Sequence, residues 1–116
     1  MLHPQEVEVW YVLPTIRKEM CRQLKKELTQ KQIADMLGIT EAAVSQYTGS
    51  KRAAKVKFSG QFNDELKRVC KQIAARKIDP FAGVQRLCRQ LYKTGEICKV
   101  HKKIENVRAC CDVCFR

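Results

Sequence analysis

The stretch LTQKQIADMLGITEAAVSQYTGSKR, residues Leu28–Arg52, decides the fold of this chain, because it reads as two short helices joined by a tight turn. Thr29 is a good N-cap, and Gln32 three residues later completes a capping box. Gly38 directly follows Leu37, at a position where a left-handed glycine ends a helix without a Cβ clash. Two helices arranged in this way can place the second one in the major groove of DNA.

The second helix of the pair is predicted to begin after Thr40, which can serve as its N-cap. Val44 and Tyr47 lie three residues apart and are predicted to face inward. The outer face then carries small and amide side chains, which suit contact with base edges. The predicted base-reading residues are Glu41, Ala42, Ser45 and Gln46. A plain helical hairpin is the alternative, but it does not explain why the glycine, the small residues and the following basic loop occur together.

The residues from Gln30 to Tyr47 follow the pattern Gln-x-x-Ile-Ala-x-x-Leu-Gly-Ile-Thr-x-x-x-Val-Ser-x-Tyr, which resembles the helix-turn-helix of Cro/repressor-type (XRE) regulators. The segments Trp10–Met20 and Glu41–Arg52 resemble a group of small archaeal transcriptional regulators that often carry cysteines near the C-terminus. The resemblance is strong over residues 5–52 and looser after that. It implies a DNA-binding regulator whose second helix reads bases and whose following loop grips phosphate.

Carried over by position, the resemblance implies two sets of DNA contacts. The start and middle of the second helix supply the base-reading residues given above. The implied phosphate contacts are Thr29, Gln30, Ser50, Lys51, Arg52 and Lys55. Glu41 departs from the glutamine common at its place in the family. Its carboxylate either accepts from cytosine N4 or favours the helix N-terminus, and both alternatives stay open.

The charge of the chain is distributed unevenly. The 116 residues carry a net charge of +11, and the length fits one domain with at most a small appendage. Residues 1–50 hold six basic and six acidic side chains, whereas residues 51–116 hold seventeen and six. The excess therefore follows the predicted recognition helix, which suits a phosphate backbone and predicts a steep salt dependence of binding. A solvated basic surface is the alternative.

Outside the central pair, the sequence predicts an all-α, repressor-like fold with a small C-terminal segment that binds metal through cysteines. A helix is expected from Pro14 to about Glu27, with a short strand possible over Val7–Leu13. Further helices are expected over Gln61–Lys77 and from Asp79-Pro80 to Gly95. The inward residues of the last helix are predicted to be Phe81, Val84, Leu87, Cys88, Leu91 and Tyr92. The predicted domains are 1–58, for DNA binding, and 59–116, a helical pair with the cysteine-rich segment.

Seven cysteines fall into two groups. Cys21 and Cys70 lie on apolar stripes and are predicted to be small core residues. The other five crowd toward the C-terminus, where a C-x-x-C can grip one metal centre. A metal would also order a segment too short to bury a core of its own, and a redox-inert tail is the alternative. The predicted metal ligands are Cys88, Cys98, Cys111 and Cys114, with Cys110 or His101 as alternates for the fourth.

The fourth ligand and the metal both stay open. Cys88 is favoured because the related regulators tend to have a cysteine in that leucine-rich helix, although its position also fits the core. Four thiolates at irregular spacing suit a [4Fe-4S] cluster, which could act as a redox or iron sensor. The alternative cofactor is zinc, as a structural Zn(Cys)4 or Zn(Cys)3His site.

The resulting hypothesis is a cytoplasmic transcription regulator that binds double-stranded DNA as a homodimer on a palindromic operator. Either the N-terminal helix, with Trp10, Tyr11 and Leu13, or the last helices would form the dimer interface. We expect no enzyme, no membrane association and no small-molecule substrate, because paired carboxylates, a nucleophile–histidine arrangement and a phosphate-binding glycine loop are all missing. The alternatives are a cluster-bearing electron carrier or enzyme, and a nucleic-acid protein of another kind, such as an antitoxin or chromatin component.

Overall fold

A computed structural model describes residues 3–49 and 57–104, and within these ranges all regular structure is helical. The all-α prediction is therefore confirmed. The elements are α1 (Pro4–Val7), the π-helical turn η1 (Glu8–Val12), α2 (Leu13–Leu24), α3 (Gln30–Leu37), α4 (Glu41–Gly49), α5 (Gly60–Ala74), α6 (Pro80–Lys93) and α7 (Glu96–Ile104). Among the described residues, no helix has the length and apolar character needed to cross a membrane.

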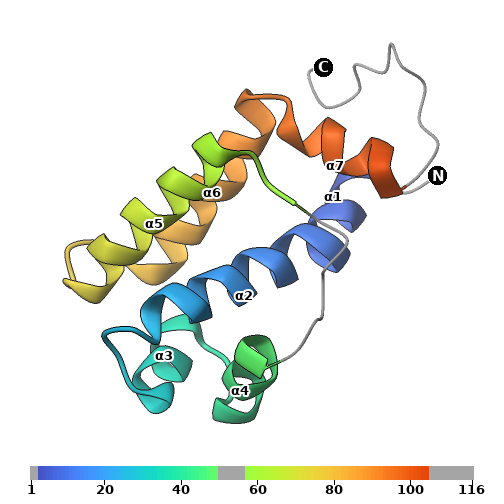
Figure 1. Ribbon diagram of the computed structural model, residues 1–116. Coiled ribbons are helices and arrows are strands. Elements are labelled where there is room, and N and C mark those ends of the chain that lie inside the picture. Colours follow the sequence, from blue (N-terminus) through green and yellow to red (C-terminus); the bar gives the residue numbers. More distant parts are fainter. Residues whose placement is uncertain (1–2, 50–56, 105–116) are drawn as a thin grey trace.

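The helix α2 runs through the middle of the molecule (Figure 1). The helices α5 and α6 lie against each other on one side of it, while α3 and α4 lie on the other side. The short helix α7 packs on α6 and returns the chain to α1. This arrangement leaves the α3–α4 pair at the edge of the molecule, held there mainly by α2.

The N-terminal segment forms one continuous helical run from Pro4 to Leu24, so the predicted start at Pro14 and the possible strand before it are wrong. Proline has no N–H to donate, and its ring crowds the carbonyl four residues earlier. The helix adapts by widening into η1, where the N–H of Leu13 bonds to the carbonyl of Glu8. The Thr15 hydroxyl also donates to a carbonyl in this turn, with an Oγ1–O distance of 2.7 Å.

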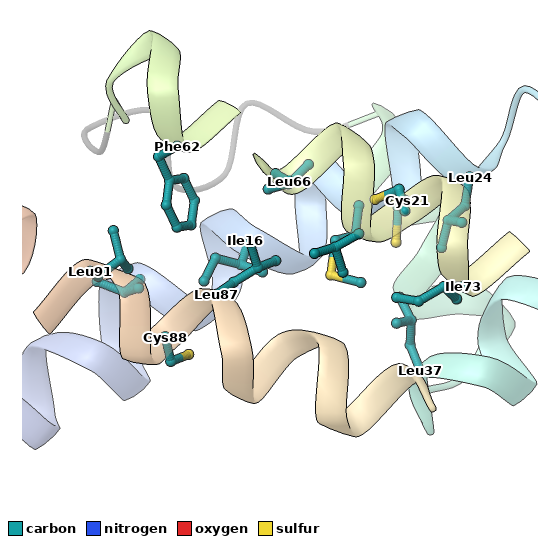
Figure 2. Close-up of a cluster of buried hydrophobic side chains, with 14 of the residues drawn as sticks. Ile16, Cys21, Leu24, Leu37, Phe62, Leu66, Ile73, Leu87, Cys88 and Leu91 are labelled. Carbon is teal, nitrogen blue, oxygen red and sulfur yellow. The ribbon is translucent and has the colours of Figure 1, made fainter. Parts of the chain in front are cut away.

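The core forms where α2, α5 and α6 meet. Ile16, Leu66 and Leu87 come from these three helices and point toward one another (Figure 2). Cys21 and Cys70 are buried in the same cluster, which confirms their predicted place in the core. The cluster contains residues from both sides of the predicted domain boundary at residue 58, so the described parts of the two halves share one core.

The predicted start of α6 is confirmed, but its inward face is partly wrong. Asp79 Oδ2 accepts the N–H of Ala82 at 3.0 Å, and Pro80 occupies the first turn. Phe81 was predicted to face inward and is instead 64% exposed. Gly83 takes the buried position of this turn, because a Cβ there would lie 2.9 Å from Val69 Cγ1, leaving no room for a larger residue.

The helix α7 was not expected from the sequence. Gly95 ends α6 in a left-handed conformation with φ 74°, as predicted, but the chain resumes a helix at the next residue. Ile97 and Val100 are buried and hold α7 on the core. The Glu96 carboxylate accepts from the N–H and the hydroxyl of Ser59, the N-cap of α5, with an Oγ–Oε2 distance of 3.2 Å. The start of α7 is thereby tied to the start of α5.

Candidate nucleic-acid interface

The helix α3 begins as the sequence predicted. Thr29 has an extended backbone, and its Oγ1 accepts the N–H of Gln32 at 3.2 Å. The Gln32 side chain completes the capping box, because its Oε1 accepts the N–H of Thr29 at 2.9 Å. Ile33, Ala34 and Leu37 are buried and fix α3 on the core. The N–H groups of the first turn that the capping box does not use point outward at the end of the helix.

The turn between α3 and α4 depends on Gly38, which has φ 67° and ψ 32°. This left-handed residue lets the N–H groups of Gly38 and Ile39 both bond to the Ala34 carbonyl, with 3.1 Å between Ile39 N and Ala34 O. Ile39 packs partly buried against the core. Thr40 then caps α4, because its Oγ1 accepts the N–H of Ala43 at 3.0 Å. The predicted turn and both predicted caps are confirmed.

The helix α4 has a buried side and an exposed side. Val44 is 2% exposed, and Tyr47 is partly buried against the core. The opposite side is open to solvent along the whole helix. All four predicted base-reading residues are exposed there: Glu41, Ala42, Ser45 and Gln46. Since Val44 packs inward, this polar face cannot turn toward the core without removing a core residue.

A side-chain hydrogen bond that sequence analysis missed joins the beginnings of α3 and α4. The Gln30 amide Nε2 donates to the carbonyl of Glu41 at 2.7 Å. The bond spans the turn and links the beginnings of the two helices. The sequence predicts only a phosphate contact for Gln30, because the resemblance offers no reason to place its amide on α4. Its position beside the exposed end of α3 is nevertheless compatible with both roles.

The remaining predicted phosphate contacts divide into two groups. Thr29 lies at the exposed N-terminus of α3, with its hydroxyl and N–H engaged in the capping box. Ser50, Lys51, Arg52 and Lys55 lie outside the described residues. Lys25, Lys26 and Lys31 are exposed on and before α3, and their positive charge near its N-terminus was not singled out by sequence analysis.

Phe81 lies over the turn of the α3–α4 pair. A Cβ built on Gly38 would be 3.0 Å from Cζ of Phe81, so the ring covers the glycine directly. The first turn of α6 thus supports the junction between α3 and α4. The prediction had placed Phe81 in the core, because its spacing from Val84 and Leu87 fits the buried stripe of α6 equally well.

Cys88 lies in an environment that favours a thiol. It is 4% exposed, and its side chain is hydrogen-bonded to the Glu8 carboxylate, which also accepts from the Tyr92 hydroxyl at 3.0 Å. Burial, then the charge of Glu8 and the hydrogen bond to it, raise the pKa of Cys88 to about 12, while Arg17 acts in the opposite direction. Metal ligation requires a thiolate, so these surroundings fit the core alternative for Cys88 better than a ligand.

The other predicted metal ligands are only partly described. Cys98 is half-buried on α7, and the alternate ligand His101 is buried on the same helix. Cys110, Cys111 and Cys114 lie outside the described residues. Within residues 3–49 and 57–104, no three His, Cys, Asp or Glu side chains are grouped so that they could hold a metal ion. The predicted metal site therefore depends on residues after Ile104.

Comparison of the chain with models of known protein families, with curated proteins and with solved structures found no match.

Proposed function

We propose that this protein is a sequence-specific transcription regulator that binds double-stranded DNA through the α3–α4 pair, used as a helix-turn-helix. The observation that carries the proposal is the two-sided character of α4. Val44 anchors one side, while the small and polar side chains of the other side are exposed together. A recognition helix needs this division, because one side must be fixed to the protein while the other enters the major groove.

The exposed face of α4 offers chemistry for each kind of base edge. The amide of Gln46 can donate to and accept from adenine in a bidentate pair. Ser45 can donate or accept, and the small Ala42 can approach the methyl group of thymine. Glu41 can accept from cytosine N4. The proposed role of the Gln30 bond is to hold these residues in register by fixing α4 against α3.

The sequence-independent part of binding is assigned to the N-terminus of α3 and to the basic residues around it. The outward N–H groups at that end of the helix attract an anion. Lys25, Lys26 and Lys31 add positive charge nearby. The proposed phosphate contacts after α4 are Ser50, Lys51, Arg52 and Lys55. Together they would clamp the phosphate backbone on either side of the groove that α4 enters.

The decisive experiment begins with selection of a binding site from random duplex DNA by the full chain. Affinities are then measured by fluorescence anisotropy for the selected site and all its single-base variants. The change Gln46→Ala should cost about 1–3 kcal/mol on the selected site and abolish discrimination at one position per half-site. The matched control is Gln85→Ala, an exposed glutamine on α6, which should change nothing.

Two results would contradict the proposal. Failure of the selection to enrich any sequence would remove sequence-specific recognition and favour a chromatin-like role. An equal loss of affinity of the Gln46→Ala variant on every sequence would show that α4 does not read bases, even if the protein binds DNA.

We also propose a metal centre at the C-terminal end, as a [4Fe-4S] cluster or a zinc site, held by Cys98, Cys111 and Cys114 with Cys110 or His101. A cluster would supply sensitivity to redox state or iron, and zinc would supply structural order only. This part of the proposal is supported by the number and spacing of the cysteines. Cys88 is left out because its thiol is bonded to Glu8 inside the core.

The metal proposal is tested by iron, sulfide and zinc analysis of protein purified without oxygen. Cys111→Ser and Cys114→Ser should lose the metal, whereas Cys88→Ser should retain it. A Cys88→Ser protein that folds but contains no metal would return Cys88 to the ligand set. Full metal content in the Cys111→Ser and Cys114→Ser variants would exclude both residues.

A further inference from the structure

An open groove of about 640 Å³ lies along the seam between α5 and α6, and we call it the α5–α6 groove. The two helices lie on the side of α2 away from α4 (Figure 1). Most of the side chains that line the groove are polar or charged, and they come from both helices. Its volume falls in the range of roughly 300–1,000 Å³ that is typical of small-molecule sites, but its polar lining indicates a charged occupant.

The side chains of α6 give the α5–α6 groove an excess of positive charge. Arg86, Arg89 and Lys93 all line the groove and are all exposed. They follow one another at three and then four residues, so they form a row on one side of the helix with a length of roughly 10 Å. The residues Pro80–Lys93 contain no acidic side chain, so the helix itself does not relieve the repulsion within this row.

The acidic residue of the lining is already neutralised. Glu65 on α5 is 7% exposed, and its Oε1 lies 3.0 Å from an Nη2 of Arg86 on the neighbouring helix. Its Oε2 lies 3.2 Å from Nη2 of Arg68. The ion pair between the helices holds the Arg86 guanidinium at the wall of the groove, and the other N–H groups of this guanidinium stay available. Two arginines thus offset one buried acid, and the groove keeps its positive charge.

The other donors of the groove have no partner within residues 3–49 and 57–104. Neither Arg89 nor Lys93 forms an ion pair or a side-chain hydrogen bond with a residue in these ranges. The side-chain amides of Gln61 and Gln85, which also line the groove, form no hydrogen bond there either. All of these groups can therefore donate to the oxygen atoms of an anion without giving up a bond that the described fold uses.

We propose that the α5–α6 groove binds a small molecule that carries two or more linked phosphate groups. A guanidinium pairs bidentately with phosphate oxygens, and an ammonium group binds phosphate as a point charge. A row of positive charges spaced by about one helical turn suits a ligand whose negative charge is spread along a chain. The inference goes beyond the proposed function, since none of the residues that line the groove belongs to α3 or α4.

The first test titrates sodium tripolyphosphate into the full chain by isothermal titration calorimetry, at a constant ionic strength of about 0.15 M. The wild type should bind a single equivalent. Arg89→Gln and Lys93→Gln should each weaken binding at least about tenfold, as expected for the loss of a charge-assisted hydrogen bond. The matched controls are Arg22→Gln and Lys71→Gln, which remove the same charges from exposed positions outside the groove and should bind like the wild type. Circular dichroism checks that all variants remain helical.

The second test locates the probe and compares it with other anions. In NMR spectra of the isotopically labelled chain, tripolyphosphate should shift the amide signals of the groove residues more than those of α2. Citrate carries carboxylates in place of phosphates and should bind more weakly than tripolyphosphate at the same ionic strength. Duplex DNA offers phosphates on a macromolecule, and Arg89→Gln and Lys93→Gln should leave its affinity unchanged.

Several outcomes overturn the inference. Absence of binding to the wild type, or equal losses in the groove variants and the control variants, shows that the groove is an ordinary solvated basic surface. Tighter binding of citrate overturns the choice of phosphate, and a parallel loss of DNA affinity in the groove variants assigns the groove to DNA. The proposed function is judged separately: tripolyphosphate binding in the groove without affinity for duplex DNA would refute the function alone, whereas specific DNA binding with an empty groove would refute the inference alone.

Discussion

At Gly38 the backbone and the packing impose the same requirement. The φ of 67° lies in the left-handed region, where a Cβ meets its own backbone. The space on that side is also taken, because Phe81 Cζ lies 3.0 Å from the position of a Cβ. The glycine therefore permits both the tight turn and the contact between α6 and the α3–α4 pair.

Gly38→Ala is expected to lower the free energy of unfolding by about 1–2 kcal/mol, from left-handed strain and from displacement of the Phe81 ring. Urea unfolding followed by circular dichroism measures the change. Gly60→Ala is the control, because a Cβ there meets no atom within 4 Å. If the ring contributes, Gly38→Ala should cost less in a Phe81→Ala background. Wild-type stability in the single variant would contradict both causes.

At the scale of the element, helix ends were predicted well because their signals are local. The capping box of Thr29 and Gln32 and the Asp79-Pro80 start each lie within four residues of sequence. The inward side of α4 was also predicted, because Val44 and Tyr47 lie three residues apart and both pack against the core. The ends of these helices depend on hydrogen bonds between residues close in sequence, so they can be predicted without knowledge of the tertiary contacts.

The sequence-based predictions were wrong where one local pattern is compatible with two structures. Pro14 is favoured at a helix start, yet here η1 absorbs it within a continuous run. Gly95 ended one helix as predicted, but its neighbour Glu96 begins another because Ser59 supplies a partner from α5. Phe81 fits the buried spacing of α6, and only the contact with Gly38 determines that it lies outside the core. Tertiary partners of this kind are not visible in periodicity.

The basic residues after Gly49 should determine how steeply the proposed DNA binding depends on salt. Lys51→Ala and Arg52→Ala are each expected to lower affinity for all sequences and to reduce the slope of log K against log salt by about 0.9. The measurement is fluorescence anisotropy on the selected DNA site at KCl concentrations from about 50 to about 300 mM. Lys93→Ala, an exposed lysine of α6, should leave the slope unchanged. An unaltered slope of log K against log salt in both variants would refute the proposed phosphate contacts.

At the scale of the whole molecule, the core of the described residues contains the cysteines Cys21, Cys70 and Cys88. Burial raises the pKa of Cys21 from its ordinary 9.0 to about 11. Burial, with a smaller contribution from Cys21, raises that of Cys70 to about 12. Cys88 reaches about 12 as described above. The core therefore holds these groups as neutral thiols. As a result, the free energy of unfolding should decrease at alkaline pH.

The direction of this linkage follows from the raised values. Below pH 8 both the folded and unfolded states keep the thiol protons, and the thiol contribution to stability is complete. Between about pH 9 and the raised pKa of each thiol only the unfolded state loses the proton, so in that range each thiol should lower the free energy of unfolding by about 1.4 kcal/mol per pH unit.

The contribution of one thiol is measured by urea unfolding of the wild type and the Cys70→Ala variant at pH values from about 7 to about 10.5. The variant should be less stable at pH 7 but should lose stability less steeply above pH 9. Val69→Ala is the control, because it opens a cavity in the same part of α5 without removing a thiol, and its slope should match the wild type. Parallel curves for all three proteins would show that Cys70 does not titrate as its burial requires.

The widened turn at Glu8–Val12 has a consequence for how this chain can change in length. Its extra residue acts as a phase shift that keeps Val7 and Ile16 aimed at the same core despite the proline between them. Deleting one residue there would turn η1 into an ordinary α-helical turn and keep the two flanking sides in phase, whereas a deletion within α2 would rotate everything upstream by about 100° about the axis. In the first case Val7 would stay directed at the core, and in the second it would leave it. The turn at Glu8–Val12 should therefore tolerate the loss of one residue better than the regular helix that follows it.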